Sequence, residues 1–316
     1  MSPSSPIFYA IGNTITESLD EILLGLSFNK KMISPKYFYD EVGSNLFDEI
    51  TKQPEYYLTR TEMEIFRCHT AEIVEQLGKD CLLIEYGSGN SQKIRVLLES
   101  LRPLAYAPLD ISNEYLTRSV KELAKEYPWL HIHAICLDFT DEFDLPFSLN
   151  ARRVGFFPGS SIGNFSRGEA AKFLKRARLL VGDDGGMLVG VDLKKDADIL
   201  NKAYNDVHGV TRAFNLNVLK HLNKKFKANF DVNNFEHLAE YQPENGCVAM
   251  YLRSLVDQKV KISGKEVSFG SGEQIHTENS HKYSLEEFIS MASDSGFRHH
   301  KVWTDVKGWF GIFYIS

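Results

Sequence analysis

The spacing of apolar residues predicts helices in the first part of the chain. Apolar positions recur there every three or four residues, which is typical of helices with one buried face. We expect helices over residues 14–28, 43–51 and 60–77, with a loop containing a proline and two tyrosines before the third. Thr14 followed by Glu17 matches the capping box that begins many helices, which supports the first of them.

From residue 81 onward, short apolar runs alternate with helical patterns. Alternating strands and helices indicate a parallel sheet with right-handed crossovers, and five such units give a doubly wound α/β core. The expected strands are 81–85, 105–109, 131–137, 154–157 and 186–191, and the expected helices include 113–127 and 167–180.

The alternation stops after the fifth strand, which indicates a second domain. We expect helix over 196–224, strands over 247–255 and 258–270, a capped helix over 284–297, and closing strands over 299–304 and 309–315. The middle segment therefore interrupts the core, and the N-terminal segment also lies outside the sheet. The predicted domains are a core of residues 61–194 and 283–316, and an α+β domain of residues 8–60 and 195–282.

Composition and charge describe a globular protein without a polyanionic partner. The chain has 316 residues, of which 43% are hydrophobic and 25% charged, and its net charge is −6. Proteins that bind nucleic acid usually carry a basic surface, and here the Lys and Arg residues are scattered among acids. We therefore expect no nucleic-acid partner, and a small-molecule ligand instead.

Cysteines and apolar runs favour a cytoplasmic protein. The four cysteines form no C-x-x-C pair and no zinc-site spacing, so we expect reduced thiols. The N-terminus lacks the pattern of a signal peptide, and no apolar stretch approaches the roughly 20 residues that span a membrane. The pairs His131/His133 and His299/His300 lack an evident third ligand, so we expect no metal site.

A glycine-rich turn follows the first core strand, and it indicates a cofactor site. Glycines in the sequence GSGN at 87–90 let the backbone approach a ligand, and the next helix directs its N–H groups toward the turn. Gln92 stands where a dinucleotide-binding turn has its last glycine, so the phosphate fingerprint is broken. The form E-x-G-x-G-x-S resembles the first motif of S-adenosylmethionine methyltransferases, although a turn without a ligand stays an alternative.

Two carboxylates at the ends of the next strands support a nucleoside ligand. Asp110 ends the second strand, where it can accept hydrogen bonds from a ribose diol. Asp138 ends the third strand, where it can accept from an adenine amino group. Either residue alone could be a helix cap or a solvated acid, but together with the turn they favour a nucleoside site.

Several segments resemble the histidine Nα-methyltransferases of ergothioneine biosynthesis, a family that also includes dimethylallyltryptophan N-methyltransferases. The resemblance covers nearly the whole chain, in particular 35–62, 84–93, 157–165, 191–196, 203–219, 248–253 and 272–284. It implies a Rossmann-like core with a closing antiparallel hairpin, and a second domain that binds the substrate. It also implies trimethylation of the α-amino group of L-histidine to hercynine, with S-adenosyl-L-methionine converted to S-adenosyl-L-homocysteine.

The resemblance assigns roles to matching residues. Cofactor contacts fall on Gly87, Ser88, Gly89, Lys93, Asp110, Asp138 and Phe139. Asn164 and Tyr204 match the residues that bind the substrate carboxylate, and Glu278 and Ser280 match those that bind the imidazole. Tyr39, Tyr56 and the Gly159 backbone match positions around the amine and the ring, and Met250 matches a position in the pocket wall. Tyr39 and Gly159 are the catalytic candidates in this assignment.

The chemistry of the side chains agrees with those roles. Neutral imidazole has one donor and one acceptor nitrogen, so Glu278 could accept from the first and Ser280 could donate to the second. In an extended segment the two side chains would project to one face. Tyr39, Tyr56 and Tyr204 could instead be core tyrosines, and Glu278 a solvated acid.

Three other functions stay open at this point. An indole substrate is one, although it offers no acceptor nitrogen to Ser280. A cofactor-binding protein without catalysis is the second, and a nucleotide-dependent oxidoreductase, disfavoured by Gln92, is the third. We expect a monomer, and no dedicated strong base is apparent near the amine.

Overall fold

The structure, a computed structural model, describes residues 5–11 and 18–316, and these form two compact units. Both units are discontinuous in sequence, because a long segment leaves the first unit and returns to it. Of the described residues, unit 1 contains 5–11, 58–194 and 282–316, and unit 2 contains 18–57 and 195–281.

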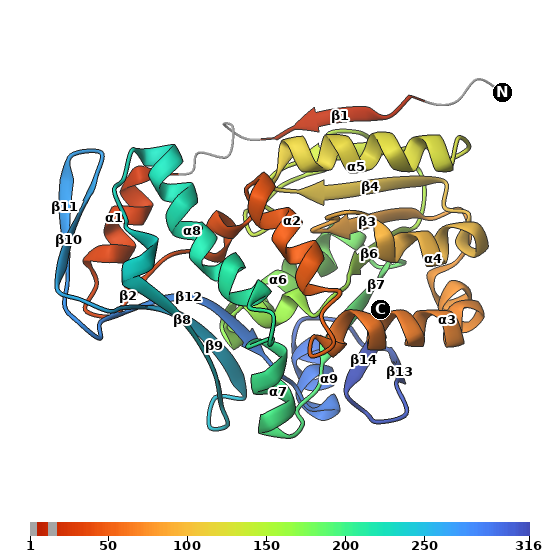
Figure 1. The fold of residues 1–316 in the computed structure, drawn as a ribbon. Coiled ribbons are helices and arrows are strands. Elements are labelled where there is room, and N and C mark those ends of the chain that lie inside the picture. The colour runs from red at the N-terminus through yellow and green to blue at the C-terminus, as the bar shows by residue number, and fades with distance from the viewer. Residues whose placement is uncertain (1–4, 12–17) are drawn as a thin grey trace. The chain divides into compact units, whose positions relative to one another are not determined.

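Unit 1 is built on an eight-stranded sheet with the order β1-β5-β4-β3-β6-β7-β14-β13 (Figure 1). The strands up to β7 run parallel, and β14 pairs antiparallel with both β7 and β13. The expected Rossmann-like core with a closing hairpin is thereby confirmed. The strands are β1 (Ile7–Ala10), β3 (Leu82–Tyr86), β4 (Ala105–Asp110), β5 (His133–Cys136), β6 (Arg153–Phe157), β7 (Gly186–Asp192), β13 (His300–Thr304) and β14 (Phe310–Ile315).

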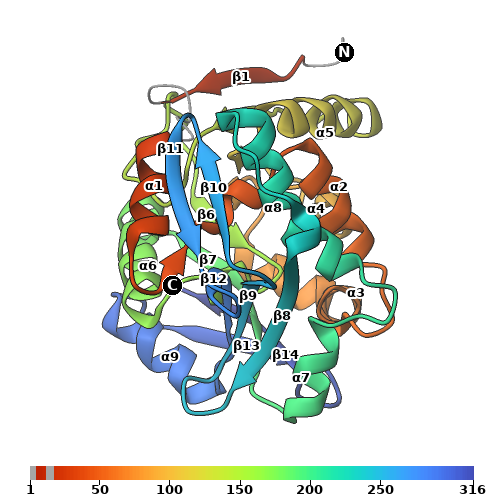
Figure 2. The same ribbon diagram turned by 60° about the vertical axis from the view of Figure 1, so that its left-hand side comes forward.

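Helices cover both faces of this sheet. Figure 2 shows α3, α4 and α5 on one side of the core strands, and α6 and α9 on the other. Capping boxes formed by Ser166 with Glu169 and by Ser284 with Glu287 start α6 and α9. The helices are α3 (Tyr57–Leu77), α4 (Gln92–Leu101), α5 (Asn113–Glu126), α6 (Arg167–Val181) and α9 (Leu285–Asp294), with a 3₁₀ turn η2 (Ser161–Asn164).

Unit 2 combines a four-stranded sheet with helices packed on it. The sheet order is β2-β12-β9-β8, and α8 packs against β8, β9, α2 and the 3₁₀ turn η1. The strands are β2 (Lys31–Met32), β8 (Phe235–Gln242), β9 (Cys247–Ser254) and β12 (Gln274–His281), with a separate hairpin of β10 (Gln258–Ile262) and β11 (Lys265–Phe269). The helices are α1 (Leu19–Ser27), η1 (Pro35–Phe38), α2 (Glu41–Ile50), α7 (Ala197–Ala203), α8 (Val210–Phe226) and η3 (Val232–Asn234).

One expectation about the N-terminal segment needs correction. Residues 8–10, expected in the second domain, belong to β1, because this short strand pairs with β5 at the edge of the core sheet. In the described residues the first helix starts at Leu19, where the Ser18 hydroxyl accepts from the Glu21 N–H and caps it. Thr14 and Glu17 lie outside the described residues.

The segment 196–224, expected to be helical, is helical except for an interruption in its middle. It forms two helices, α7 and α8, separated by a turn that ends at Gly209. Asp206 stabilises this break, since its carboxylate accepts from the backbone N–H groups of Val210 and Thr211 at 2.7 Å each. An acid that caps a new first turn stops the preceding helix from continuing.

Candidate active site

The glycine-rich turn lies at the carboxyl end of β3, where open α/β sheets bind ligands. Gly87 and Gly89 adopt φ values of +69° and +51°, which residues with a Cβ rarely adopt. A Cβ on Gly89 would meet nothing within 4 Å, so open space lies beside the turn. The buried Ser88 hydroxyl has no hydrogen-bond partner among the described residues. Open space beside an unsatisfied buried hydroxyl is what a ligand with polar groups would fill.

Asp110, at the end of β4, supports the turn from the neighbouring strand. Its carboxylate accepts from the Gly89 N–H and from the Ser112 N–H, each at 2.9 Å. Burial raises the pKa of this carboxyl group. Each carboxylate oxygen can accept more than one hydrogen bond, so Asp110 can hold the turn and also receive ligand hydroxyls.

Asp138 and Phe139 follow β5 and contact different partners. Asp138 Oδ1 accepts from the backbone N–H and the hydroxyl of Thr140, at 2.9 and 2.6 Å, so it caps its own turn. The Phe139 ring lies beside the glycine turn, 3.6 Å from where a Cβ on Gly87 would stand. Phe139 therefore forms an apolar wall next to the turn.

Sequence reasoning missed a buried glutamate that joins two candidate positions. The Glu62 side chain is 0% exposed, and its carboxylate lies 2.7 Å from Lys93 Nζ. The same carboxylate accepts from the Gly159 N–H at 2.7 Å. Gly159 has a φ of +80°, which favours glycine, and a Cβ there would lie 2.5 Å from Lys93 Nζ, so the lysine side chain would have to shift. The signal in the sequence was a lone acid on an apolar helix face, next to Ile65 and Phe66.

A second buried glutamate lies behind the turn. Glu85 is 1% exposed on β3, and its carboxyl group accepts from the Tyr106 hydroxyl. Burial raises the pKa of Glu85 to about 8, which outweighs the opposing effects of Tyr106 and Lys93. Glu85 is therefore mostly protonated at neutral pH.

The loop after β6 carries Gly159 and Asn164. Asn164 ends the 3₁₀ turn η2, and the Ser160 hydroxyl accepts from the Asp192 N–H at 2.9 Å. This bond fixes the loop to the end of β7. Gly159 and Asn164 therefore belong to unit 1, together with the cofactor candidates.

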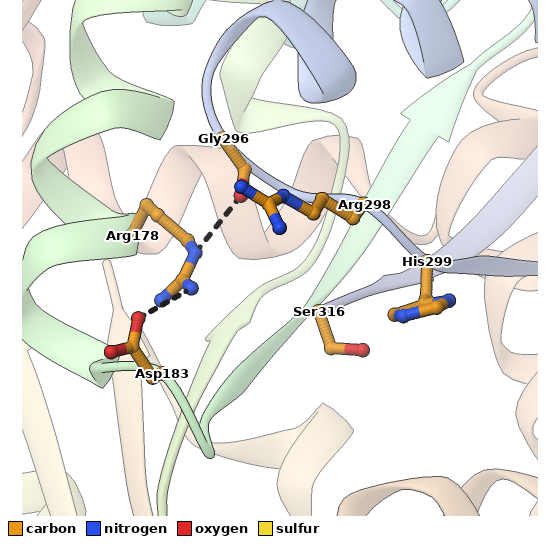
Figure 3. A pocket seen from close by; sticks show the side chains of 6 residues that line it. All are labelled: Arg178, Asp183, Gly296, Arg298, His299 and Ser316. Atoms are coloured by element: carbon orange, nitrogen blue, oxygen red, sulfur yellow. Dashed lines mark hydrogen bonds and ion pairs between the residues drawn. The ribbon is translucent and has the colours of Figure 1, made fainter.

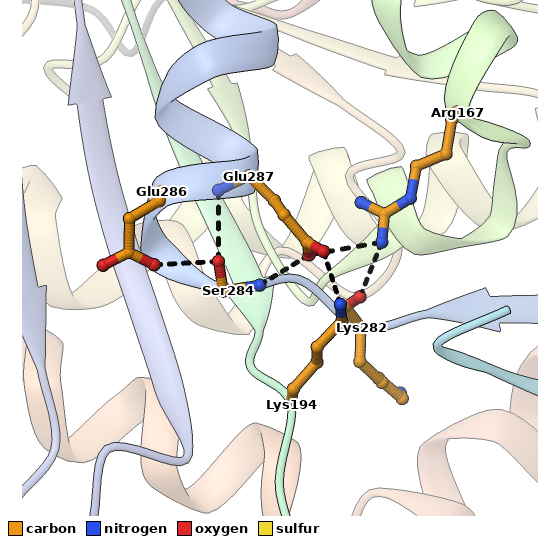
Figure 4. A network of polar contacts seen from close by, with 6 residues as sticks. All are labelled: Arg167, Lys194, Lys282, Ser284, Glu286 and Glu287. Carbon is orange, nitrogen blue, oxygen red and sulfur yellow. Dashed lines mark hydrogen bonds and ion pairs between the residues drawn. The ribbon is translucent and has the colours of Figure 1, made fainter. Parts of the chain in front are cut away.

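The segment 195–281 leaves and re-enters unit 1 at one place, shown in Figure 4. The Lys194 N–H donates to the Tyr283 carbonyl at 2.9 Å, and Glu287 accepts from the Lys194 side chain. Lys282 Nζ forms a fully buried ion pair with Asp192 at 2.7 Å, while its carbonyl accepts from Arg167. One fully buried ion pair and several partly exposed contacts hold the two ends of the segment together.

The substrate candidates of unit 2 gather on one face of its sheet. Met250 on β9 stands directly opposite Glu278 on β12, and Ser280 follows two residues later. All three are buried, with exposed fractions of 2%, 8% and 5%. The Tyr204 hydroxyl donates to Ser280 Oγ at 2.6 Å. A hydroxyl that accepts from Tyr204 is oriented to direct its own proton elsewhere.

Aromatic rings continue this set within unit 2. Tyr204 lies edge-on to Tyr56, with ring centroids 6.2 Å apart, and Tyr56 lies edge-on to Phe47 at 6.4 Å. Tyr39 contacts both Phe47 and Phe214, at 6.1 and 5.9 Å. Phe47 and Phe214 were not singled out from the sequence, because an aromatic residue on a helix face reads as ordinary core.

Residues 18–316 match the model of the histidine-specific, S-adenosylmethionine-dependent methyltransferases. The chain belongs to this family. It is 38% identical to a histidine N-alpha-methyltransferase of Mycolicibacterium smegmatis, over 96% of each chain. It is 33% identical to ergothioneine biosynthesis protein 1 of Neurospora crassa, over 84% of this chain and 31% of that longer protein. A 4-dimethylallyltryptophan N-methyltransferase of Claviceps purpurea is 26% identical over 96% of each chain.

The methyltransferase uses S-adenosylmethionine, and the residues at the turn fit that molecule. The open space at Gly89, the unsatisfied Ser88 hydroxyl and the buried Asp110 carboxylate offer room and hydrogen-bonding groups to a nucleoside. The turn needs no phosphate-binding glycine, because S-adenosylmethionine carries no phosphate group.

Other features of the methyltransferase lie away from these residues. A cavity of about 490 Å³ in unit 1 is lined by Arg178, Asp183, Gly296, Arg298, His299 and Ser316 (Figure 3). It lies near the start of β7, whereas the glycine turn follows the carboxyl end of β3. Arg178 is hydrogen-bonded to Asp183 and to the Gly296 carbonyl. Among residues 5–11 and 18–316, no three His, Cys, Asp or Glu side chains could hold a metal ion together. Within the same ranges, no helix is both long and apolar enough to cross a membrane.

Proposed function

We propose that this methyltransferase transfers methyl groups from S-adenosyl-L-methionine to the α-amino group of L-histidine, up to the trimethylated product hercynine. This reaction would begin ergothioneine biosynthesis. The relatives named above support it, because the two most similar of them are a histidine N-alpha-methyltransferase and an ergothioneine biosynthesis protein. The observation that carries the proposal is that the Glu278 and Ser280 side chains lie on the same buried face of the sheet.

In this proposal, unit 2 reads the imidazole ring. Glu278 accepts from the protonated ring nitrogen, and Ser280, already accepting from Tyr204, donates to the other nitrogen. Met250 closes the pocket opposite Glu278. A ligand without the ring donor would leave the carboxylate of Glu278 unsatisfied, which is how polar sites reject analogues strongly.

The remaining groups hold the reactants in line. S-adenosylmethionine, when bound, supplies a methyl group already activated by the sulfonium charge. We assign Asp110 to the ribose, Asp138 and Phe139 to the adenine, and Lys93 to a cofactor contact at the turn of Gly87, Ser88 and Gly89. Alignment of amine, methyl and sulfur can contribute roughly 7–11 kcal/mol toward the barrier.

Tyr39, Tyr56 and the Gly159 backbone line the region of the amine in this assignment. Asn164 and Tyr204 hold the substrate carboxylate. An aromatic face attracts a methylated ammonium through its quadrupole, which favours repeated methylation at one site. No carboxylate or imidazole stands among the residues assigned to the amine, so we propose that its proton passes to water or along a path lined by tyrosines.

Incubation with labelled S-adenosylmethionine and each of the twenty amino acids tests the proposal. We expect label in histidine above all others, with mono-, di- and trimethylated products seen by mass spectrometry. Label in tryptophan instead would favour the indole-type substrates of the Claviceps relative. Histamine provides a further control, since it lacks the carboxylate that Asn164 and Tyr204 are proposed to bind and should react poorly.

We also propose that the protein is a cytoplasmic monomer. Light scattering on the purified protein would check the oligomeric state, and cell fractionation would check the localisation.

A further inference from the structure

Strand β12 contains one residue more than its partner over the stretch that carries Glu278. On β9, Tyr251 and Met250 are adjacent, but they stand opposite His276 and Glu278, so Thr277 has no counterpart. One extra residue on one strand of an antiparallel pair is a β-bulge. Bulges re-aim the side chains that follow them.

The bulge decides which face of the sheet carries Glu278. Side chains alternate between faces along a strand, and directly opposite residues share a face. Ile275 stands opposite Leu252, and Glu278 stands opposite Met250, so these four side chains lie on one face. In a regular strand, positions 275 and 278 would lie on opposite faces. If Thr277 instead paired regularly with Met250, Glu278 would stand opposite Ala249 and point to the other face of the sheet.

A hydrogen bond on the opposite face of the sheet agrees with this shift in the alternation of side chains. His276 Nε2 lies 2.8 Å from Asn279 Oδ1, although residues three apart in a regular strand point to opposite sides. The two side chains share a face only because Thr277 is inserted between them. The contact also bridges the irregular backbone from the side away from Glu278.

Thr277 itself fixes the bulge to β9. It is 1% exposed, and its hydroxyl donates to the Met250 carbonyl at 3.1 Å. A bulge interrupts the backbone ladder, and this hydroxyl supplies a hydrogen bond to a carbonyl beside the interruption. The residue that anchors the bulge is thus bonded to the residue directly opposite Glu278.

We propose that the bulge at Thr277, held by the Thr277 hydroxyl and by the His276–Asn279 contact, is the positioning device that sets histidine specificity, because it places Glu278 and Ser280 together on the buried face that carries Met250. The inference rests on the proposed function, because it assigns a supporting role to residues around the proposed imidazole site. Thr277, His276 and Asn279 do not touch the substrate in this proposal.

The test compares Thr277→Val, Thr277→Ser and Asn279→Ala with the wild type. Valine keeps the shape of threonine but loses the hydroxyl, and serine keeps the hydroxyl. For Thr277→Val and Asn279→Ala we expect kcat/KM for histidine to fall by about three- to tenfold, the usual effect of one lost hydrogen bond, mainly through KM. Preference for histidine over phenylalanine and tryptophan should fall with it, while S-adenosylhomocysteine affinity stays unchanged. Thr277→Ser should retain most of the preference.

Ser254→Ala is the matched control. Ser254 is also a buried hydroxyl of β9's sheet that donates to a carbonyl, that of Val256 at 2.8 Å, but it lies at the far end of the strand. This variant should lose stability without losing preference. Equal loss of preference in Ser254→Ala, or full preference in both Thr277→Val and Asn279→Ala, would overturn the inference.

The proposed function is checked first and separately. A wild type that does not methylate histidine would overturn that function, and this inference with it, before any variant is compared. A wild type that prefers histidine, a Glu278→Ala variant that loses the preference, and bulge variants that keep it would overturn the inference alone.

Discussion

Replacing Glu62 tests whether a buried charge organises the cofactor side of the site. Glu62 is 0% exposed and pairs with Lys93, whose side chain is 22% exposed. Removing one partner of a buried ion pair costs about 3–5 kcal/mol. Because Lys93 keeps some contact with water, we expect Glu62→Ala to lower the free energy of unfolding by about 2–4 kcal/mol.

Glu62→Gln separates the charge from the hydrogen bond. The amide oxygen can still accept from the Gly159 N–H, so we expect about half the loss of stability. Both variants release Lys93 from its partner. We therefore expect S-adenosylhomocysteine affinity to fall by about tenfold in calorimetry, which corresponds to roughly 1.4 kcal/mol.

Glu72→Gln is the matched control for both measurements. Glu72 lies on the same helix, α3, and pairs with Lys301 at 3.0 Å, but its side chain is 49% exposed. An exposed pair contributes about 0–1 kcal/mol, so this variant should unfold and bind almost as the wild type does. If Glu62→Ala matched Glu72→Gln in both stability and affinity, Glu62 would not organise Lys93 and Gly159.

Three further predictions follow from the buried acids. Asp110→Ala should weaken S-adenosylhomocysteine binding by about 1–3 kcal/mol, and unchanged affinity in a folded variant would remove Asp110 from the site. Glu278→Ala should lower histidine turnover strongly and weaken discrimination against tryptophan and phenylalanine, which parallel assays on the three amino acids would check. Burial raises the pKa of Glu85 from 4.5 to about 8. Between pH 4.5 and about pH 8, the carboxyl group is therefore protonated in the folded protein but ionised in the unfolded chain. Stability should therefore fall as pH rises through that window, by up to about 1.4 kcal/mol per pH unit, and urea unfolding of Glu85→Gln should show a flatter pH dependence than the wild type.

The core could be predicted because its parallel strands are buried on both faces. Strands such as β4 and β7 are buried at every position, so they read as continuous apolar runs between helical patterns. The glycine turn and Asp110 were found for the same reason, since the ends of such strands are easily located.

Strand β12 could not be predicted, because polar residues proposed to bind the substrate stand where a strand usually has apolar residues. Its buried face carries Glu278 and Ser280 in place of apolar residues, which removes the alternation that marks a strand. The extra residue at Thr277 also breaks the period of two. Strand β8, mostly half-buried, shows little contrast between its faces either. Glu62 escaped notice because only tertiary packing reveals that an acid is buried and paired.

The strand orders also constrain how the chain folds as it is synthesised. β14 lies inside the core sheet between β7 and β13, and β12 lies inside the second sheet between β2 and β9. Both internal strands come late in the chain, so a nascent polypeptide emerging from the ribosome can complete neither sheet until its last part has been translated. Until then β7, buried at every position in the finished protein, offers an unpaired edge. The edge of β7 therefore stays unpaired while residues 193–309 are synthesised, and an unpaired edge of this kind favours aggregation.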